Sequence, residues 1–221
     1  MDRKQNMSVK GVVPASGMGS VSGGKIAIIS DSHDNIANTE KFLAWAKKNE
    51  IATIIHCGDV SAPSMIKKVI VPMFSGPIHL VHGNVSDREL LKKVCAEFKN
   101  VTLHGDEGFL EISHPLVPPK RNTPPRAGEE NLKIAFCHFP ERAKELAESG
   151  QYNLVFYGHT HKPWAAQLKL GEPRPAGREE CRLVNPGEVA GQRFKPTFAI
   201  YDTETDKLEL KILERRPINW N

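Results

Sequence analysis

The chain has 221 residues, of which 39% are hydrophobic and 25% are charged, and its formal net charge is +4. A chain of this length and composition buries a sizeable core, which argues against extensive disorder, and its basic residues form no long run, which argues against a nucleic-acid-binding protein. No apolar run approaches the roughly 18 residues that a membrane span needs, so we expect no membrane partner.

Cysteine usage indicates a reducing compartment. The 4 cysteines lie far apart and include no Cys-x-x-Cys pair of the kind that holds structural zinc. We therefore expect Cys57, Cys95, Cys137 and Cys181 to be buried free thiols in a cytoplasmic protein.

The first half of the chain alternates buried strands with amphipathic helices. Residues 1–24 have no continuous apolar core and indicate a flexible leader rather than a signal peptide. Beyond them, the periodicity predicts strands at 25–30, 52–56 and 77–82 and helices at 38–49, 62–70 and 87–98. Ser86 and Glu89 fit a capping box at the start of the third helix. This alternation is typical of a layered α/β fold that begins with parallel strands.

The second half of the chain is richer in strands. The pattern predicts a strand pair at 101–105 and 108–113, buried strands at 132–138 and 153–159 around a helix at 141–149, and closing antiparallel strands at 181–185, 197–203 and 207–213 with a turn at 203–206. Two mixed sheets packed face to face with helices outside them accommodate all these elements in one domain at 25–221. The segments 113–131, which is Pro-rich, and 171–180 are predicted surface loops, and tolerated insertion explains them better than a lid.

Residues that can bind metals stand at the ends of several apolar runs. They are Asp31 and His33, Asp59, Asn84, His138, and His159 with His161. Ligands collect beyond the carboxyl ends of parallel strands in an open α/β sheet, so these side chains are expected to converge. Side chains two apart on an extended segment share a face, so each D-x-H or H-x-H pair can act as a clamp. A glycine precedes three of the candidates, at Gly58, Gly83 and Gly158, and allows a sharp turn with close backbone approach.

The donor set is a mixture of nitrogen and oxygen. Histidine, aspartate and asparagine together suit manganese, iron, nickel or zinc, are poor for calcium, and lack the thiolates of structural zinc. These donors exceed what one ion can use, which implies two ions that share a bridging carboxylate. Taken singly, Asp59 is explained as a helix cap, His138 as a core residue and the H-x-H pair as incidental. The joint pattern favours a metal centre.

These motifs carry a family resemblance. The order D-x-H, G-D, G-N, H and G-H-x-H resembles the calcineurin-like metallophosphoesterase superfamily, and "GHTHKP" followed by "LVNPGEV" resembles its small prokaryotic phosphodiesterase branch. The resemblance spans residues 25 to about 213 and implies a four-layer αββα fold with a dinuclear centre. It assigns Asp31, His33 and His161 to the first metal, Asn84, His138 and His159 to the second, and Asp59 to the bridge. We expect Mn²⁺, with Ni²⁺, Fe²⁺, Zn²⁺ and Mg²⁺ as alternatives.

The resemblance also implies an activity. A hydroxide shared by two ions would attack the phosphorus of a small phosphodiester in line, and phosphomonoesters are further candidate substrates. Asp59, Asn84 and His138 are the residues that the resemblance places at the reaction.

Three departures from the family pattern limit what it implies. Many members carry a histidine directly after the motif asparagine, where this chain has Val85, so another group or water must protonate the leaving group. This favours substrates with good leaving groups, such as activated aryl diesters. His82 stands where small relatives often have arginine, and the acid Asp87 falls one place late. Phe139 and Pro140 follow the motif histidine, where glycine is usual.

Other functions compete with hydrolysis. A non-catalytic scaffold of the same fold, like the retromer subunit that binds partner proteins, would not need a full second-metal set, and this chain has one. A metallo-β-lactamase shows H-x-H-x-D-H, whereas Lys162, Pro163 and Trp164 follow His161. A DNA nuclease of the superfamily would carry extra DNA-binding elements. Apolar surface on the later strands offers an interface for a homo-oligomer.

Two further polar residues have structural explanations. We expect His56 to be packed in the core or hydrogen-bonded to the backbone, and Asn35 to cap a helix.

Overall fold

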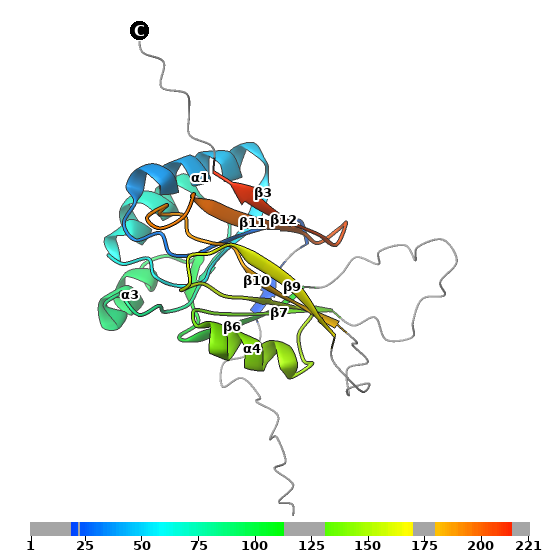
Figure 1. Ribbon diagram of the computed structural model, residues 1–221. Coiled ribbons are helices and arrows are strands. Elements are labelled where there is room, and N and C mark those ends of the chain that lie inside the picture. The colour runs from blue at the N-terminus through cyan, green and yellow to red at the C-terminus, as the bar shows by residue number, and fades with distance from the viewer. Residues whose placement is uncertain (1–18, 22, 113–130, 170–179, 214–221) are drawn as a thin grey trace, which may run out of the picture.

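Two mixed sheets and the helices on their outer faces form four layers in the computed structural model (Figure 1). The structure describes residues 19–21, 23–112, 131–169 and 180–213. The predicted loops at 113–131 and 171–180 lie almost entirely outside these residues, as does most of the predicted leader. Helices α1 and α3 lie over one sheet and α4 over the other. The predicted αββα arrangement is confirmed.

The first sheet begins with parallel strands, as the sequence predicts. In spatial order it contains β12 (Lys207–Ile212), β11 (Thr197–Asp202), β2 (Lys25–Ile29), β3 (Ile51–His56), β4 (Ile78–Leu80) and β5 (Val101–Leu103). Strands β2 to β5 are parallel, and β11 is antiparallel to β2 and β12. The predicted turn at 203–206 joins β11 to β12. The carboxyl ends of β2, β3 and β4 therefore meet at one edge.

The second sheet contains three strands that the sequence misjudges. Its spatial order is β1 (Gly19–Val21), β6 (Glu107–Ile112), β7 (Leu132–Cys137), β8 (Leu154–Phe156), β10 (Glu180–Asn185) and β9 (Trp164–Lys169). Strand β1, from the predicted flexible leader, pairs with β6. Strand β10 is parallel to β8 and antiparallel only to β9. The edge strand β9 is mostly exposed and has no buried face to mark it in the sequence.

The predicted pairing of 101–105 with 108–113 is wrong. Strand β5 pairs with β4, whereas β6 pairs with β7 in the other sheet. Gly105, with φ at +88°, lies in the short connection where the chain leaves the first sheet. Leu110 and Ile112 then bury their side chains in the core between the sheets. Burial of these side chains in the core between the two sheets, rather than formation of a local hairpin with β5, explains why β6 pairs with β7.

The helices follow the predicted order, with one corrected cap. They are α1 (Ile36–Lys48), the π-helical turn η1 (Ile66–Ile70) continued by α2 (Val71–Met73), α3 (Arg88–Cys95) and α4 (Pro140–Glu148). Asn35 caps α1 by accepting the Asn38 N–H at 3.0 Å, as expected. Asp87, not Ser86, caps α3, because Ser86 Oγ accepts the N–H of Ser61 instead. No helix in the described residues is long and apolar enough to cross a membrane.

The hydrophobic core has three layers. One lies between the first sheet and its helices, one between the two sheets, and one between the second sheet and α4. Representative members are Phe42 and Leu91, Phe136 and Tyr201, and Leu146 and Tyr152. All 4 cysteines are buried and none forms a disulfide, as predicted.

A histidine pair between the sheets makes stability depend on pH. His79 Nδ1 and His104 Nε2 are 3.0 Å apart, and the His104 ring contacts Phe136 of the other sheet. Burial lowers the pKa of each ring from 6.5 to about 4. The unfolded chain therefore binds more protons between these values. We expect the contribution of these two rings to the free energy of unfolding to be constant above about pH 7.5 and to fall by about 1 kcal/mol per pH unit for each ring between pH 6 and 5.

Urea unfolding of the metal-free protein across this pH range tests the pair. The double variant His79→Leu, His104→Leu removes both titrating rings but leaves the other acid-sensitive groups, such as His56, in place. Its free energy of unfolding should fall less steeply with acid. An identical slope in the variant and the wild type would show that the pair does not titrate in this way.

Candidate metal centre

The predicted ligands follow strands of both sheets and converge at one end of the molecule. Asp31 and His33 follow β2, Asp59 follows β3, Asn84 follows β4, His138 follows β7, and His159 and His161 follow β8. The strands are parallel within each sheet, so their carboxyl ends lie together. Short contacts between side chains link all seven predicted residues.

Asp31, His33 and His161 form a first cluster. The Nε2 atoms of His33 and His161 are 3.2 Å apart. Asp31 Oδ1 lies 3.3 Å from Nε2 of His161 and 3.7 Å from Nε2 of His33. One donor atom from each residue lies within 4.8 Å of the others. Three potential ligand atoms therefore face one small volume.

Asn84, His138 and His159 form a second cluster beside the first. Asn84 Oδ1 lies 2.9 Å from His138 Nε2 and 3.0 Å from His159 Nδ1. The carboxylate of Asp59 lies between the two clusters, with Oδ2 at 3.3 Å from His138 Nε2 and 3.9 Å from His33 Nε2. Its other oxygen, Oδ1, accepts the Val85 N–H at 3.0 Å.

The backbone at these residues is strained. Asp31, His33, Asp59, His159 and His161 all have positive φ, between 38° and 66°. A non-glycine residue rarely adopts this left-handed region, and such strain tends to gather at functional sites, where the surrounding structure maintains it. The strained turns direct five of the seven predicted side chains into the clusters.

Two glycines let the backbone approach the aspartates. A Cβ at Gly83 would lie 1.9 Å from Asp59 Oδ1, and one at Gly158 would lie 2.8 Å from Asp31 Oδ2 and still closer to Ser30. Gly58 has φ at +97°. The sequence predicts all three glycines to serve close approach or a sharp turn, and the structure confirms this.

Three of the four histidines of the clusters are oriented through their second ring nitrogen. His138 Nδ1 donates to the Cys57 carbonyl at 2.9 Å, and His161 Nδ1 donates to Glu188 Oε2 at 3.0 Å. His33 Nδ1 lies 3.2 Å from Ser61 Oγ. Donation from Nδ1 leaves the Nε2 lone pairs of His138 and His161 directed into the clusters. Metal-binding histidines typically show this arrangement.

Glu188 is the functional residue that sequence reasoning missed. Its carboxyl group is fully buried, and it also accepts the N–H groups of Gln192, Arg193 and Phe194. It lies in the "LVNPGEV" segment that supports the family resemblance, but no motif assigned it a role. A carboxylate that contacts the outer nitrogen of a predicted ligand histidine has no fixed sequence separation from it, so only the fold reveals it.

The carboxylates create a strongly negative environment. The nearby Asp31 carboxylate raises the pKa of His33, against the effect of burial. Burial acts to lower the pKa of His138, but Asp59 outweighs it and raises that pKa. Burial likewise acts to raise the pKa of Asp59, but the hydrogen bond and charge of His138 outweigh it, so the pKa is lowered. The site therefore favours positive charge.

The residues present fit divalent metal ions. Asp31 Oδ1 is buried and has no hydrogen-bond partner, although Oδ2 accepts the His159 N–H at 3.1 Å. A bare buried carboxylate oxygen is costly unless a cation or donor satisfies it. Imidazole and carboxylate donors without thiolates suit first-row transition metals.

The remaining predicted residues lie around the centre. His56 is buried as expected, but its Nε2 bonds Ser32 Oγ at 3.0 Å rather than the backbone. His82 is 8% exposed and lines a cavity of about 340 Å³, together with Arg88, Lys92 and His104 among other residues.

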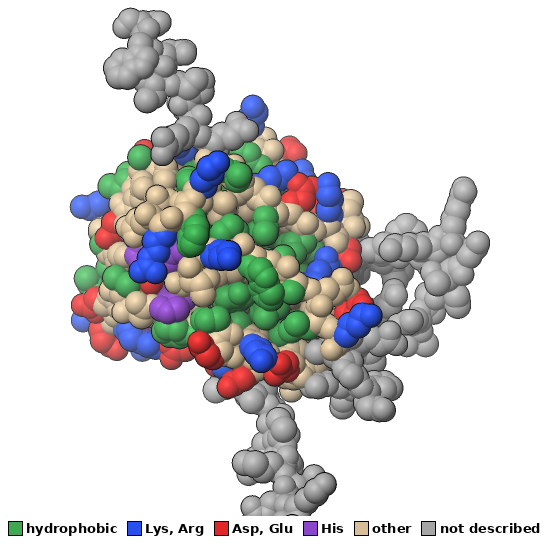
Figure 2. Space-filling model, viewed as in Figure 1, with side chains coloured by type: hydrophobic (Ala, Val, Ile, Leu, Met, Phe, Trp, Pro, Cys, Tyr) green, Lys and Arg blue, Asp and Glu red, His purple; other side chains and the backbone are tan. Residues whose placement is uncertain are grey.

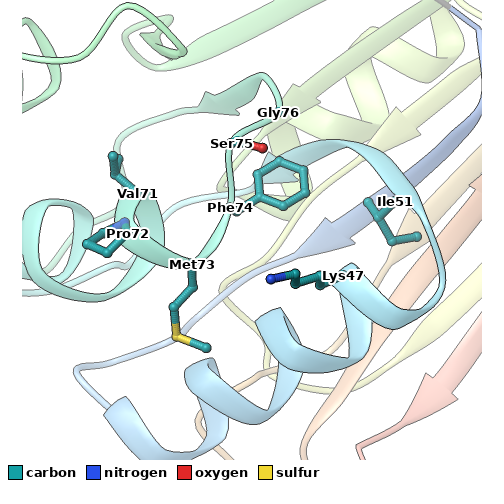
Figure 3. Close-up of a pocket in the computed structure, with 8 residues that line it drawn as sticks. All are labelled: Lys47, Ile51, Val71, Pro72, Met73, Phe74, Ser75 and Gly76. Atoms are coloured by element: carbon teal, nitrogen blue, oxygen red, sulfur yellow. The ribbon is translucent and has the colours of Figure 1, made fainter.

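A larger cavity of about 400 Å³ lies between the end of α1 and α2 (Figure 3). It is lined by Lys47, Ile51 and residues 71–76, none of them a predicted ligand.

Comparison with known proteins points the same way. The family model described as the calcineurin-like phosphoesterase superfamily domain matches residues 25–206. Phosphodiesterase MJ0936 of Methanocaldococcus jannaschii is 27% identical over 193 residues, which cover 86% of this chain and 99% of that protein. The solved structure of an archaeal phosphodiesterase has a TM-score of 0.63 at 25% identity, over 85% of this chain and 99% of that one. Vps29 from Entamoeba histolytica, solved with zinc, has a TM-score of 0.51 at 15% identity, over 86% and 99%, and shows the fold alone.

Proposed function

Because this chain belongs to the calcineurin-like phosphoesterase superfamily, we propose that it is a dinuclear metal-dependent phosphodiesterase that also accepts phosphomonoesters. The observation that carries the proposal is the convergence of two groups of ligand atoms on either side of the Asp59 carboxylate. The similarity to an archaeal phosphodiesterase over nearly its whole length supports the substrate class.

Each cluster would hold one divalent ion. Asp31, His33 and His161 would bind the first, Asn84, His138 and His159 the second, and Asp59 would be shared, with Mn²⁺ as the proposed ion. Two such ions, when bound, would supply the nucleophile by activating water and would neutralise the charge of the phosphoryl oxygens.

The protein's own residues would orient the ligands and control protons. Glu188 and the Cys57 carbonyl hold the Nδ1 protons of His161 and His138, so each ring keeps an unprotonated Nε2 for binding. Val85, which follows Asn84, is apolar and cannot donate a proton to the leaving group. Diesters with good leaving groups should therefore be cleaved fastest.

The cysteines bear on the compartment. Four buried thiols without a disulfide support a reducing compartment such as the cytoplasm.

A protein-binding scaffold of the same fold is the alternative function. The likeness to Vps29 shows that this fold also occurs in a protein that is not named a phosphodiesterase. The contacts that join Asn84 to His138 and His159 favour catalysis, since a scaffold has no need of them.

Restoring metal to the stripped protein tests the proposed function. We expect Mn²⁺ to restore cleavage of bis(p-nitrophenyl) phosphate, with the diester preferred over p-nitrophenyl phosphate because no side-chain acid stands beside Asn84. The variant His161→Ala should lose the activity, because it removes a ligand of the first cluster. Absence of turnover with Mn²⁺, Ni²⁺, Zn²⁺ and Mg²⁺, in protein that binds two ions per chain, would refute hydrolysis of simple diesters and favour the scaffold.

A further inference from the structure

An exposed aromatic side chain borders the second cluster. Phe139 directly follows His138 in the sequence and is 42% exposed. The ring centroid lies 4.9 Å from that of His138 and 5.0 Å from that of His159. Phe139 thus touches two predicted ligands of one ion while much of its surface faces solvent.

The backbone fixes the position of this ring. Phe139 is the residue before helix α4, and Pro140 occupies the first turn of that helix. The Phe139 carbonyl accepts the Ala143 N–H at 3.1 Å and the Cys137 thiol at 3.5 Å. The ring therefore projects from the amino end of a helix that packs on the second sheet.

A second exposed apolar residue is adjacent in sequence to a member of the second cluster. Val85 is 51% exposed and follows Asn84, whose Oδ1 contacts both histidines that touch Phe139. Its backbone N–H is held by Asp59. Figure 2 shows histidine side chains that reach the surface beside hydrophobic and basic side chains.

Packing within the protein does not account for these exposed apolar groups. A phenylalanine that leaves two-fifths of its surface in water forgoes part of the hydrophobic stabilisation that full burial would give. An aromatic ring beside a polar site is suited to a ligand that is charged at one end and planar and apolar at the other.

We propose that Phe139 binds a planar aromatic group esterified to the phosphate of the substrate, with Val85 as a second apolar contact. This inference deepens the proposed function and rests on it. The phosphoryl group would lie at the metal clusters, and the aromatic group would stack on the exposed face of Phe139. Phe139 is then a residue that selects substrates, not one that takes part in the chemistry.

Binding of stable phosphorus compounds to the Mn²⁺-loaded chain tests Phe139 without turnover. The first pair is phenylphosphonate and methylphosphonate, and the second is the non-hydrolysable 5′-methylenephosphonate analogues of adenosine 5′-monophosphate and ribose 5-phosphate. Within each pair only the aromatic group differs. We expect wild-type protein to bind the aromatic member about 3- to 10-fold more tightly, the gain typical of aromatic stacking. The variant Phe139→Tyr should keep the preference, and Phe139→Leu, which keeps apolar bulk without a ring, should lose it.

The outcomes are separable from those of the hydrolysis test. Loss of the preference in Phe139→Leu for both pairs supports recognition of any planar ring, and loss for the nucleotide pair alone supports a nucleobase. An unchanged preference in Phe139→Leu, or no preference in the wild type, overturns the inference even if the diester is hydrolysed. If the protein shows no hydrolytic activity but its preference for the aromatic compounds still depends on Phe139, the aromatic site stands and the proposed reaction is refuted. Equal Mn²⁺ content in all three proteins shows that the clusters are intact.

Discussion

Asp59→Asn is expected to lower the rate of metal-dependent diester hydrolysis by at least about 10³-fold. The effect follows from the two oxygens of Asp59, of which Oδ1 accepts the Val85 N–H and Oδ2 lies between His33 and His138. An asparagine can keep the first contact with its amide oxygen, but it then turns an N–H₂ group toward the metal ligands. Loss of a shared anionic ligand removes several kcal/mol of stabilisation of the transition state.

The rate of bis(p-nitrophenyl) phosphate cleavage and the number of bound ions should be measured on the same samples. Asp202→Asn serves as a matched control, because Asp202 Oδ1 accepts the N–H groups of Glu204 and Thr205 in the β11–β12 turn, which an amide oxygen can also accept. The control should hydrolyse the diester at the wild-type rate. Cleavage by Asp59→Asn within about threefold of the wild type would contradict a bridging role for Asp59.

Glu188→Ala is expected to cost roughly 3 kcal/mol of unfolding free energy in the metal-free protein. Glu188 is fully buried, and its oxygens accept from the His161 ring and from three successive backbone N–H groups at 192–194. Alanine would leave these donors without partners. It would also leave His161 free to rotate or change tautomer, so Mn²⁺ affinity should fall about 10- to 100-fold.

Urea unfolding and Mn²⁺ titration of two variants separate the two effects. Glu188→Gln keeps the shape of the side chain but only one oxygen, so it should lose less stability than Glu188→Ala while still weakening Mn²⁺ binding. The exposed Glu204, in the β11–β12 turn, provides the control Glu204→Ala, which should change neither property. Wild-type stability in Glu188→Ala would show that the buried carboxyl group does not organise the centre.

The sequence predicts the layers and the positions of the ligands because these depend on simple periodicities. Apolar runs that end near Asp31, Asp59 and Asn84 predict strands whose carboxyl ends lie together, and parallel pairing of β2, β3 and β4 brings this about. A strand that is buried on both faces appears in the sequence as a continuous apolar run, which is easy to recognise. Gly83 and Gly158 are likewise recognisable, because close backbone contact excludes a side chain there.

Other features depend on contacts that no local pattern encodes. Strand β6 lies only a few residues after β5, but the shared core places it in the other sheet. Asp87 replaces Ser86 as the cap of α3 because the hydroxyl of Ser86 is used by Ser61, a residue far away in sequence. Glu188 reaches His161 across the fold in the same way. The left-handed backbone at Asp31 and His33 is held by their N–H groups, which donate to the carbonyls of Gly58 and Asp59, residues distant in sequence.

The most direct test is a titration of metal-stripped protein with Mn²⁺ in which bound ions and diester cleavage are followed together. If the two clusters act as one centre, hydrolysis should remain low with one ion per chain and rise as the second ion binds. Full activity with one ion per chain, or no activity with two, would contradict a dinuclear phosphodiesterase.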